Sequence, residues 1–96
     1  MSSSTLKIAA NRGGALKFNK SKLTAKSGIV TITMNNPSSL DHGIAIEGNG
    51  VDQSGNTVGH GAVSTVSANL KPGTYTFYCP VDGHKDLGMK GTLTVK

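Results

Sequence analysis

Apolar and polar side chains alternate along several short stretches of the chain. Residues 30–35 alternate valine, isoleucine and methionine with threonine and asparagine, and residues 92–95 alternate threonine with leucine and valine. Successive side chains of a β-strand point to opposite faces, so a two-residue period indicates a strand with one apolar and one polar face. Both stretches are therefore predicted to be half-buried strands.

Turn-forming sequences interrupt the chain at short intervals. Clusters rich in glycine, proline, asparagine and serine occur at residues 12–14, 27–28, 36–39, 48–50, 54–56, 59–61, 71–73 and 82–84. They leave short extended segments and no helical period of useful length. The 13 glycines and the many valines, isoleucines and threonines also favour strands and turns over helices. The sequence thus predicts an all-β fold, a Greek-key β-sandwich or barrel of about seven to eight strands.

The chain is long enough for one domain and too short for two. It contains 96 residues, and globular domains commonly have about 100–150. We expect a single domain over residues 1–96, with residues 1–4 as a frayed lead-in. No apolar run exceeds three residues, so we expect no transmembrane segment. Hydrophobic residues make up only 35% of the chain, which predicts a thin core stabilised by a further element such as a bound metal.

The net charge of +5 is unevenly distributed along the chain. Residues 1–40 contain six basic residues and no acidic one, whereas residues 41–96 contain four lysines and all five acidic residues. The basic block is expected to form a solvated face that could attract an acidic partner. It lacks the aromatic side chains and clustered arginines that nucleic-acid-binding surfaces use, so binding of nucleic acid is not expected.

Two residues with metal-binding side chains are predicted to face the core. The two-residue period groups His42 with Ile44 and Ile46, and Cys79 with Phe77. Taken alone, an inward histidine or cysteine is most often structural. Cys79 is the only cysteine, so it forms no internal disulfide and its thiol needs another explanation.

The loop that follows Cys79 gathers soft metal ligands. His84 and Met89 follow Cys79 at intervals of five residues, and His42 supplies a second inward imidazole. Two imidazoles and a thiolate in one plane, with a distant thioether, form a site that suits copper in both oxidation states. Zinc rarely binds methionine, and structural zinc sites usually contain paired cysteines. A binuclear copper centre would need a second, bridging cysteine. The pattern therefore favours a single mononuclear copper site.

Two other interpretations of these residues are weaker. A catalytic cysteine would need an exposed thiolate beside a base, whereas Cys79 ends an alternating strand, so no enzymatic activity is expected. His60 lies between two glycines and is expected in a surface loop rather than in a metal site.

At these residues the sequence resembles the cupredoxin family of small blue copper proteins. The resemblance covers essentially the whole chain and is carried by residues 41–43, 71–79 and 91–95, together with a Cys-x4-His-x4-Met loop whose spacing is most similar to that of rusticyanin. It implies a Greek-key β-sandwich that binds one type 1 copper ion and carries single electrons between larger redox proteins. The copper ligands that it implies are His42, Cys79 and His84 in the plane and Met89 as the weak axial ligand.

The resemblance also implies a setting for this activity. The partners would be a redox donor and a redox acceptor, and an acidic docking surface on them would suit the basic block. The family implies a periplasmic or extracytoplasmic location, and the chain is expected to act as a monomer. Two alternatives stay open: a copper-holding protein for delivery or resistance, and a domain excised from a larger copper oxidase. The ring edge of His84 would reach the surface, framed by Pro37, Pro80, Val81 and Leu87.

One departure from the family concerns the residue after the first histidine. In many cupredoxins this residue is an asparagine or a serine that ties the two ligand segments together, whereas here it is Gly43. Only its backbone amide could take that role. Because Pro80 has no amide hydrogen, the donors available to the Cys79 sulfur are the amides of Gly43 and Val81.

Overall fold

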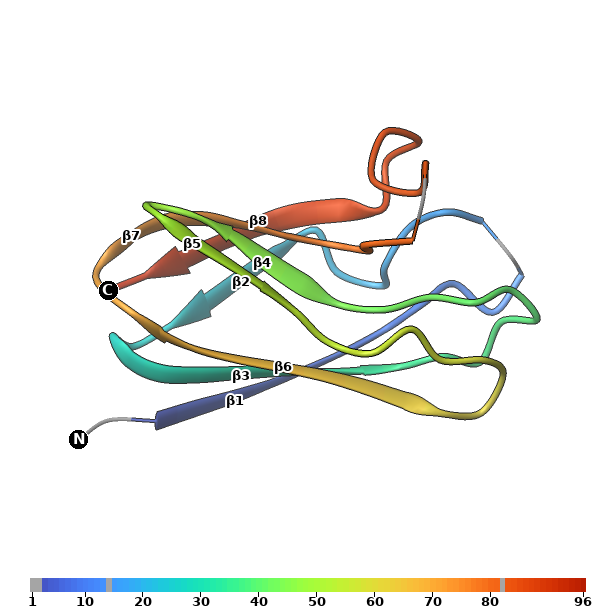
Figure 1. Ribbon diagram of the computed structural model, residues 1–96, viewed down its shortest axis with the longest axis horizontal. Coiled ribbons are helices and arrows are strands. Elements are labelled where there is room, and N and C mark those ends of the chain that lie inside the picture. The colour runs from blue at the N-terminus through green and yellow to red at the C-terminus, as the bar shows by residue number, and fades with distance from the viewer. Residues whose placement is uncertain (1–2, 14, 82) are drawn as a thin grey trace.

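The computed structural model describes residues 3–13, 15–81 and 83–96, and this part of the chain contains eight β-strands and no helix (Figure 1). The strand β1 (Ser3–Ala9) precedes the first long connection, and β2 (Lys22–Ala25) follows it. The others are β3 (Gly28–Asn35), β4 (Ala45–Gly48), β5 (Val51–Ser54), β6 (Val63–Leu70), β7 (Gly73–Tyr78) and β8 (Lys90–Val95). In the described residues, no helix has the length and apolar character needed to cross a membrane.

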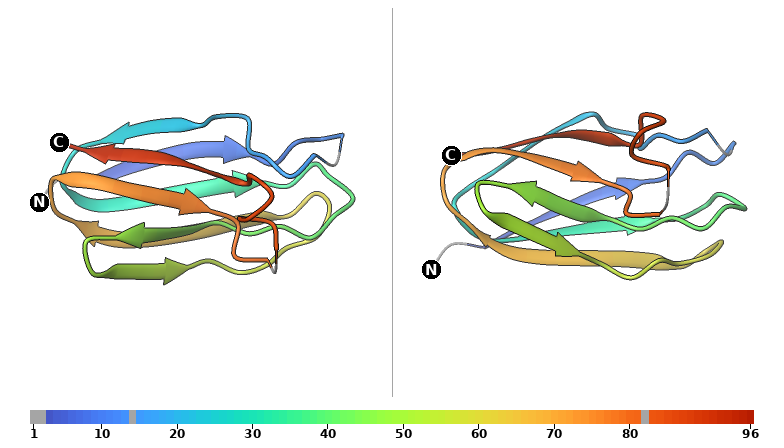
Figure 2. Two further views of the ribbon diagram at one scale, coloured as in Figure 1. Left: turned by 90° about the horizontal axis from the view of Figure 1, so that it is seen from above. Right: turned by 45° about the horizontal axis from the view of Figure 1, so that its top comes forward.

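The strands form two sheets that face each other, as the two views of Figure 2 show. The three-stranded sheet has the order β1-β3-β6, and the five-stranded sheet has the order β2-β8-β7-β4-β5. Most connections pass from one sheet to the other, and only β4–β5 and β7–β8 follow each other within a sheet. The prediction of an all-β Greek-key sandwich with seven to eight strands is confirmed.

The core lies between the sheets and follows the predicted alternation. Within β3, Val30, Ile32 and Met34 are fully buried, and the residues between them are partly exposed. In β8 the buried positions are Leu93 and Val95, as predicted. The core is completed from the neighbouring strands and connections by Ile8, Phe18, Leu23, Ile44, Ile46, Val66, Leu70, Tyr75 and Phe77.

The prediction of a frayed lead-in over residues 1–4 is wrong for Ser3 and Ser4. Ser3 and Ser4 belong to β1 and pair in parallel with Ile29 and Val30 of β3. The backbone of β3 has hydrogen-bonding groups on both edges, and pairing with β1 satisfies those that β6 leaves free. Polar side chains do not prevent this pairing, because Ser3 stays exposed. Residues 1 and 2 lie outside the described residues.

The six basic residues of the basic block, which lie between positions 7 and 26, do not form a single face. Lys7 lies on β1 in the three-stranded sheet, whereas Lys22 lies on β2 in the five-stranded sheet. Arg12, Lys17 and Lys20 lie in the connection between these strands, and all five side chains are exposed. The chain crosses from one sheet to the other within this segment, so its charges are shared between two faces and one end of the sandwich.

Two adjacent strands and one loop determine where the predicted ligands lie. In the five-stranded sheet, β4 and β7 are antiparallel neighbours, with Ala45 opposite Tyr78. His42 precedes the start of β4 and Cys79 follows the end of β7, so the sheet brings both to the same end of the molecule. The loop 80–89 joins β7 to the adjacent strand β8 and therefore returns to that end.

Candidate metal centre

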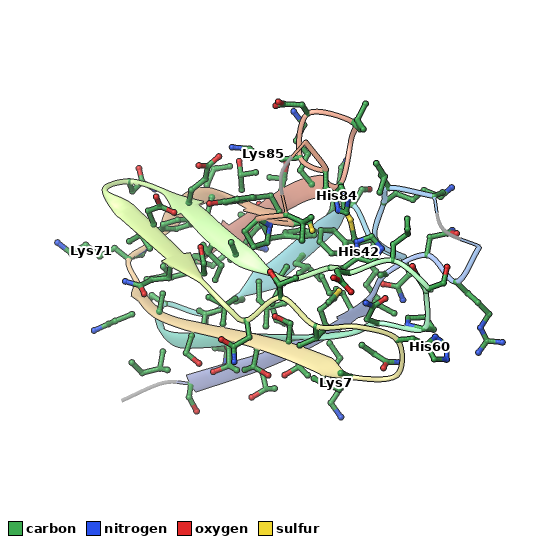
Figure 3. All side chains as sticks on the ribbon, turned by 45° about the vertical axis from the view of Figure 1, so that its right-hand side comes forward. Lys7, His42, His60, Lys71, His84 and Lys85 are labelled. Carbon is green, nitrogen blue, oxygen red and sulfur yellow. The ribbon has the colours of Figure 1, made fainter. Side chains whose placement is uncertain are left out.

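Three of the four predicted ligands converge at this end of the sandwich. The Nδ1 atom of His84 lies 3.5 Å from the Sγ atom of Cys79, and the Nδ1 atom of His42 lies 4.0 Å from it. The three donor atoms all lie within 4.8 Å of one another. Figure 3 shows the two imidazoles side by side, and their ring centroids are 5.1 Å apart. The three side chains thus present two nitrogens and one sulfur around a common point.

The backbone of the loop places Met89 next to the other predicted ligands. The amide of Met89 donates to the carbonyl oxygen of His84 over 3.0 Å, and the amide of Cys79 donates to the carbonyl oxygen of Met89 over 3.0 Å. A third bond, from the His84 amide to the Val81 carbonyl oxygen, turns the loop on itself. Met89 is therefore attached to both the cysteine and the histidine segments, and its side chain is fully buried.

Only one of the four predicted ligands has exposed surface. His42, Cys79 and Met89 have no exposed surface, whereas His84 is partly exposed. Two leucines in the segments that carry the histidines are largely exposed, Leu40 by 42% and Leu87 by 70%. Of the two predicted ligand imidazoles, only that of His84 reaches the surface.

The thiol of Cys79 lies in an apolar environment that two amides moderate. Burial raises the pKa of the Cys79 thiol, and the backbone amides of Gly43 and Val81 oppose this rise. The Gly43 nitrogen is 3.5 Å from Sγ. A Cβ atom on Gly43 would come within 3.1 Å of the Asn56 carbonyl oxygen and 3.3 Å of the Pro80 ring. Glycine at this position therefore lets the two ligand segments approach closely, and the predicted donation from its amide to the sulfur is present.

His42 is held from behind by a residue that the sequence analysis did not single out. Its Nε2 atom lies 3.2 Å from the hydroxyl oxygen of Ser38, which is fully buried. Burial lowers the pKa of His42 below its usual 6.5, and the nearby His84 lowers it further, whereas Asp41 acts in the opposite direction. The ring is thus kept neutral near pH 7. In the sequence, residues 36–39 indicated only a turn, and nothing in the spacing pointed to Ser38.

Lys85 fastens the ligand loop to the five-stranded sheet. Its Nζ atom forms an ion pair with Glu47 of β4 and lies 4.5 Å from the centroid of the Tyr78 ring on β7. Lys85 directly follows His84, as Figure 3 shows, so these contacts restrain the backbone next to the partly exposed ligand.

The prediction that His60 lies in a surface loop outside the metal site is confirmed. This residue is exposed and lies apart from the three donor atoms.

The donor set fits copper better than other metals. Thiolate and thioether sulfur favour Cu(I), imidazole nitrogen is accepted by Cu(II), and a trigonal N2S plane with a weak axial sulfur is typical of electron-transfer copper sites. One type 1 copper ion is compatible with His42, Cys79, His84 and Met89 as they are placed here. Such a site changes its charge by one electron while the β-sandwich keeps the ligands in place.

Comparisons with solved structures identify similar folds. Auracyanin B has a TM-score of 0.84 and 22% identity, covering 97% of this chain and 88% of that one. Reduced auracyanin from Roseiflexus castenholzii has a TM-score of 0.82 and 27% identity, covering 100% and 99%. Auracyanin A, a blue copper protein from Chloroflexus aurantiacus, has a TM-score of 0.82 and 22% identity, covering 99% and 100%.

Comparisons at the level of sequence identify a family. No curated protein sequence matches the chain significantly. The family model described as copper binding proteins, plastocyanin/azurin family, matches residues 4–96. That match includes both ligand segments and all eight strands except the first residue of β1. The chain therefore belongs to the plastocyanin/azurin family of copper-binding proteins, the cupredoxins.

Proposed function

We propose that this protein is a carrier of single electrons that uses one copper ion held by His42, Cys79, His84 and Met89. The observation that supports this most directly is the convergence of two imidazole nitrogens and one thiol sulfur within 4.8 Å, in the closed end of a β-sandwich. When bound, copper supplies a one-electron couple between Cu(I) and Cu(II). The two histidines, Cys79 and Met89 would hold the ion, because thiolate and thioether sulfur favour Cu(I) while imidazole nitrogen also accepts Cu(II).

The burial of the ligands favours a carrier over a copper-holding protein. A protein that delivers copper must release it, so its ligands need to be accessible for exchange. Here three of the four side chains are fully buried, and only His84 is partly exposed. The exposed imidazole provides the contact through which electrons enter and leave. The neighbouring Leu40 and Leu87 provide a small apolar surface, which suits brief encounters between redox proteins.

The proposal extends to the partners and the setting. The partners are a redox donor and a redox acceptor, and exposed Lys17, Lys20 and Lys22 favour an acidic surface on them. Membership of the cupredoxin family supports a periplasmic or extracytoplasmic location. The monomer is taken as the working unit, because all four ligands come from one chain.

The proposal is tested by adding Cu(II) to the metal-free protein and recording the absorption spectrum. A short bond between Cu(II) and the thiolate gives an intense band in the visible region, so a blue or greenish protein with one copper per chain is expected. Cys79→Ser removes the thiolate and should abolish the band. Full colour in that variant would contradict the ligand assignment.

A second measurement separates the carrier from a copper-holding protein. The blue protein is cycled between its oxidised and reduced forms in the presence of a chelator specific for Cu(I). A carrier keeps its copper and recovers its full absorbance after each cycle. Transfer of the copper to the chelator within the first cycles would favour the copper-holding alternative.

A further inference from the structure

A buried hydrogen-bonded network lies behind His42, on the side away from Cys79. It is built from Asn36 and Ser38, neither of which has any exposed surface. The side-chain amide of Asn36 donates to the carbonyl oxygens of Leu40 (2.8 Å) and Val58 (2.9 Å), and its side-chain oxygen accepts from the Ser38 amide (3.1 Å). Asn36 thus holds the segment that leads to His42 in one conformation.

The backbone also anchors this network at both ends. The Asn36 amide donates to the Ala62 carbonyl oxygen, and the Asn36 carbonyl oxygen accepts from the Gly61 amide over 2.7 Å. His42 forms a two-way backbone bridge with Val58, at 3.1 and 2.8 Å. The hydroxyl of Ser38 is therefore presented to the imidazole by a framework whose own polar groups are paired.

The two nitrogens of the His42 ring face different groups. Nδ1 of His42 faces the Cys79 sulfur, and Nε2 faces the Ser38 hydroxyl oxygen at 3.2 Å. If Nδ1 is the copper ligand, the hydrogen of the neutral ring is on Nε2. The Ser38 oxygen already accepts from the Leu40 amide over 2.8 Å, and its second lone pair is then available for the His42 Nε2–H.

The geometry points to Ser38 as the positioning residue that orients the His42 ring through its Nε2 atom. This inference rests on the proposed function, because it takes Nδ1 of His42 as the copper ligand. Hydrogen bonding from the non-ligating nitrogen fixes the ring and raises its basicity as a ligand. Ser38 thereby supplies from an upstream segment an attachment that Gly43, with no side chain, does not provide.

The chain offers a matched control for removing this hydroxyl. Ser64 is also buried, with 1% of its surface exposed, and its hydroxyl donates to the Asn56 carbonyl oxygen over 2.5 Å. Ser38→Ala and Ser64→Ala each delete one buried serine hydroxyl and one or more hydrogen bonds, but only Ser38→Ala removes a contact with a predicted ligand. Both variants are compared with the wild type for copper affinity, by competition with a chelator, and for reduction potential.

Ser38→Ala should lower copper affinity about 10- to 100-fold, the usual effect of losing such a partner. The reduction potential should become more positive, because a less basic imidazole stabilises Cu(II) less. Ser64→Ala should leave both quantities close to the wild type. Equal effects of the two variants, or no effect of Ser38→Ala on either quantity, would overturn the inference.

A measurement without copper keeps the inference testable if the proposed function fails or a variant does not fold. NMR of the metal-free wild-type protein shows whether the His42 ring is held with Nε2 towards Ser38. The inference requires nuclear Overhauser effects between the Ser38 side chain and the His42 ring, and their absence would contradict it. If the wild type shows no copper band but these contacts are present, the proposed function fails while the orienting role of Ser38 stands.

Discussion

The sulfur of Cys79 experiences two opposing influences at the scale of single residues. The apolar surroundings disfavour the thiolate and raise the pKa of the thiol, whereas the amides of Gly43 and Val81 stabilise negative charge on the sulfur. In a copper site the thiolate donates more of its charge to Cu(II) than to Cu(I). The two amides therefore stabilise the reduced state relative to the oxidised state.

Val81→Pro tests this balance, because proline has no amide hydrogen to donate. Loss of one donor to the sulfur should lower the reduction potential while the visible band is retained. The direction is opposite to that expected for Ser38→Ala, so the two variants distinguish effects at the sulfur from effects at the imidazole. Cyclic voltammetry of both proteins gives the comparison. A potential that is level or higher in Val81→Pro, with the ligands intact, would exclude this role for the amide.

His42 makes the stability of the metal-free protein depend on pH. Burial lowers its pKa in the folded state below the usual 6.5, so the unfolded chain binds a proton more readily. The free energy of unfolding should therefore fall as the pH is lowered through 6.5 towards the folded-state pKa, by about 1.4 kcal/mol for each unit of pKa difference. At higher pH, where the ring is neutral in both states, this contribution to the pH dependence vanishes.

Urea unfolding of the metal-free protein at pH 7.5 and pH 5 measures this effect. His42→Asn should reduce the loss of stability between the two pH values, because the titrating ring is absent. If the variant and the wild type lose the same stability on acidification, burial of His42 is not the cause.

At the scale of elements, the aromatic ring of Phe77 on β7 lies over Gly91 on β8. The two residues are directly opposite in the antiparallel pair, and Phe77 is fully buried. A Cβ atom on Gly91 would collide with the Phe77 ring and would lie 2.6 Å from the Ser21 carbonyl oxygen. Gly91 therefore leaves space both for the core aromatic residue and for the segment that enters β2.

Gly91→Ala should destabilise the protein by about 1–3 kcal/mol, because the ring and the neighbouring backbone must move to admit the methyl group. Thr92→Ala changes an exposed position of the same strand and should alter stability by less than about 0.5 kcal/mol. Chemical denaturation of both variants provides the measurement. An unchanged stability of Gly91→Ala would show that the strands adapt without cost.

The elements also show how far a sequence can be interpreted. The alternation in residues 30–35 and 92–95 predicted two core strands correctly, because burial of one face depends only on a local period of two. Pairing of Ser3 with Ile29 was not predicted, because it depends on a free edge supplied by a distant strand. The spacing from Cys79 to Met89 likewise indicated the ligand loop, whereas the contact between Ser38 and His42 depends on the loop conformation and left no signal in the sequence.

At the scale of the whole molecule, the distribution of charge differs between the two ends of the sandwich. Lys22 lies opposite Thr92, near the start of β8 and therefore near the ligand loop, and Lys20 precedes it. Ala25 pairs with Val95 at the other end of β8, and Lys26 directly follows Ala25. Lys71 lies just before β7, also far from His84, as Figure 3 shows. The count of charges was clear from the sequence, but their division between the ends required the fold.

This division gives a test of electrostatic steering with a matched control. Lys20→Glu with Lys22→Glu and Lys26→Glu with Lys71→Glu change the net charge equally, at the end near the site and at the far end. With hexacyanoferrate(III) as an anionic oxidant, the first pair should slow oxidation of the Cu(I) protein more than the second at low salt. The difference should nearly vanish towards 1 M salt, where the Debye length is about 3 Å.

With a cationic cobalt(III) phenanthroline complex as oxidant, the order of the rates for the two double variants should reverse, because the lysines near the site repel this oxidant. Equal slowing by both pairs at low salt would mean that net charge alone matters and that the lysines near the site do not guide the partner.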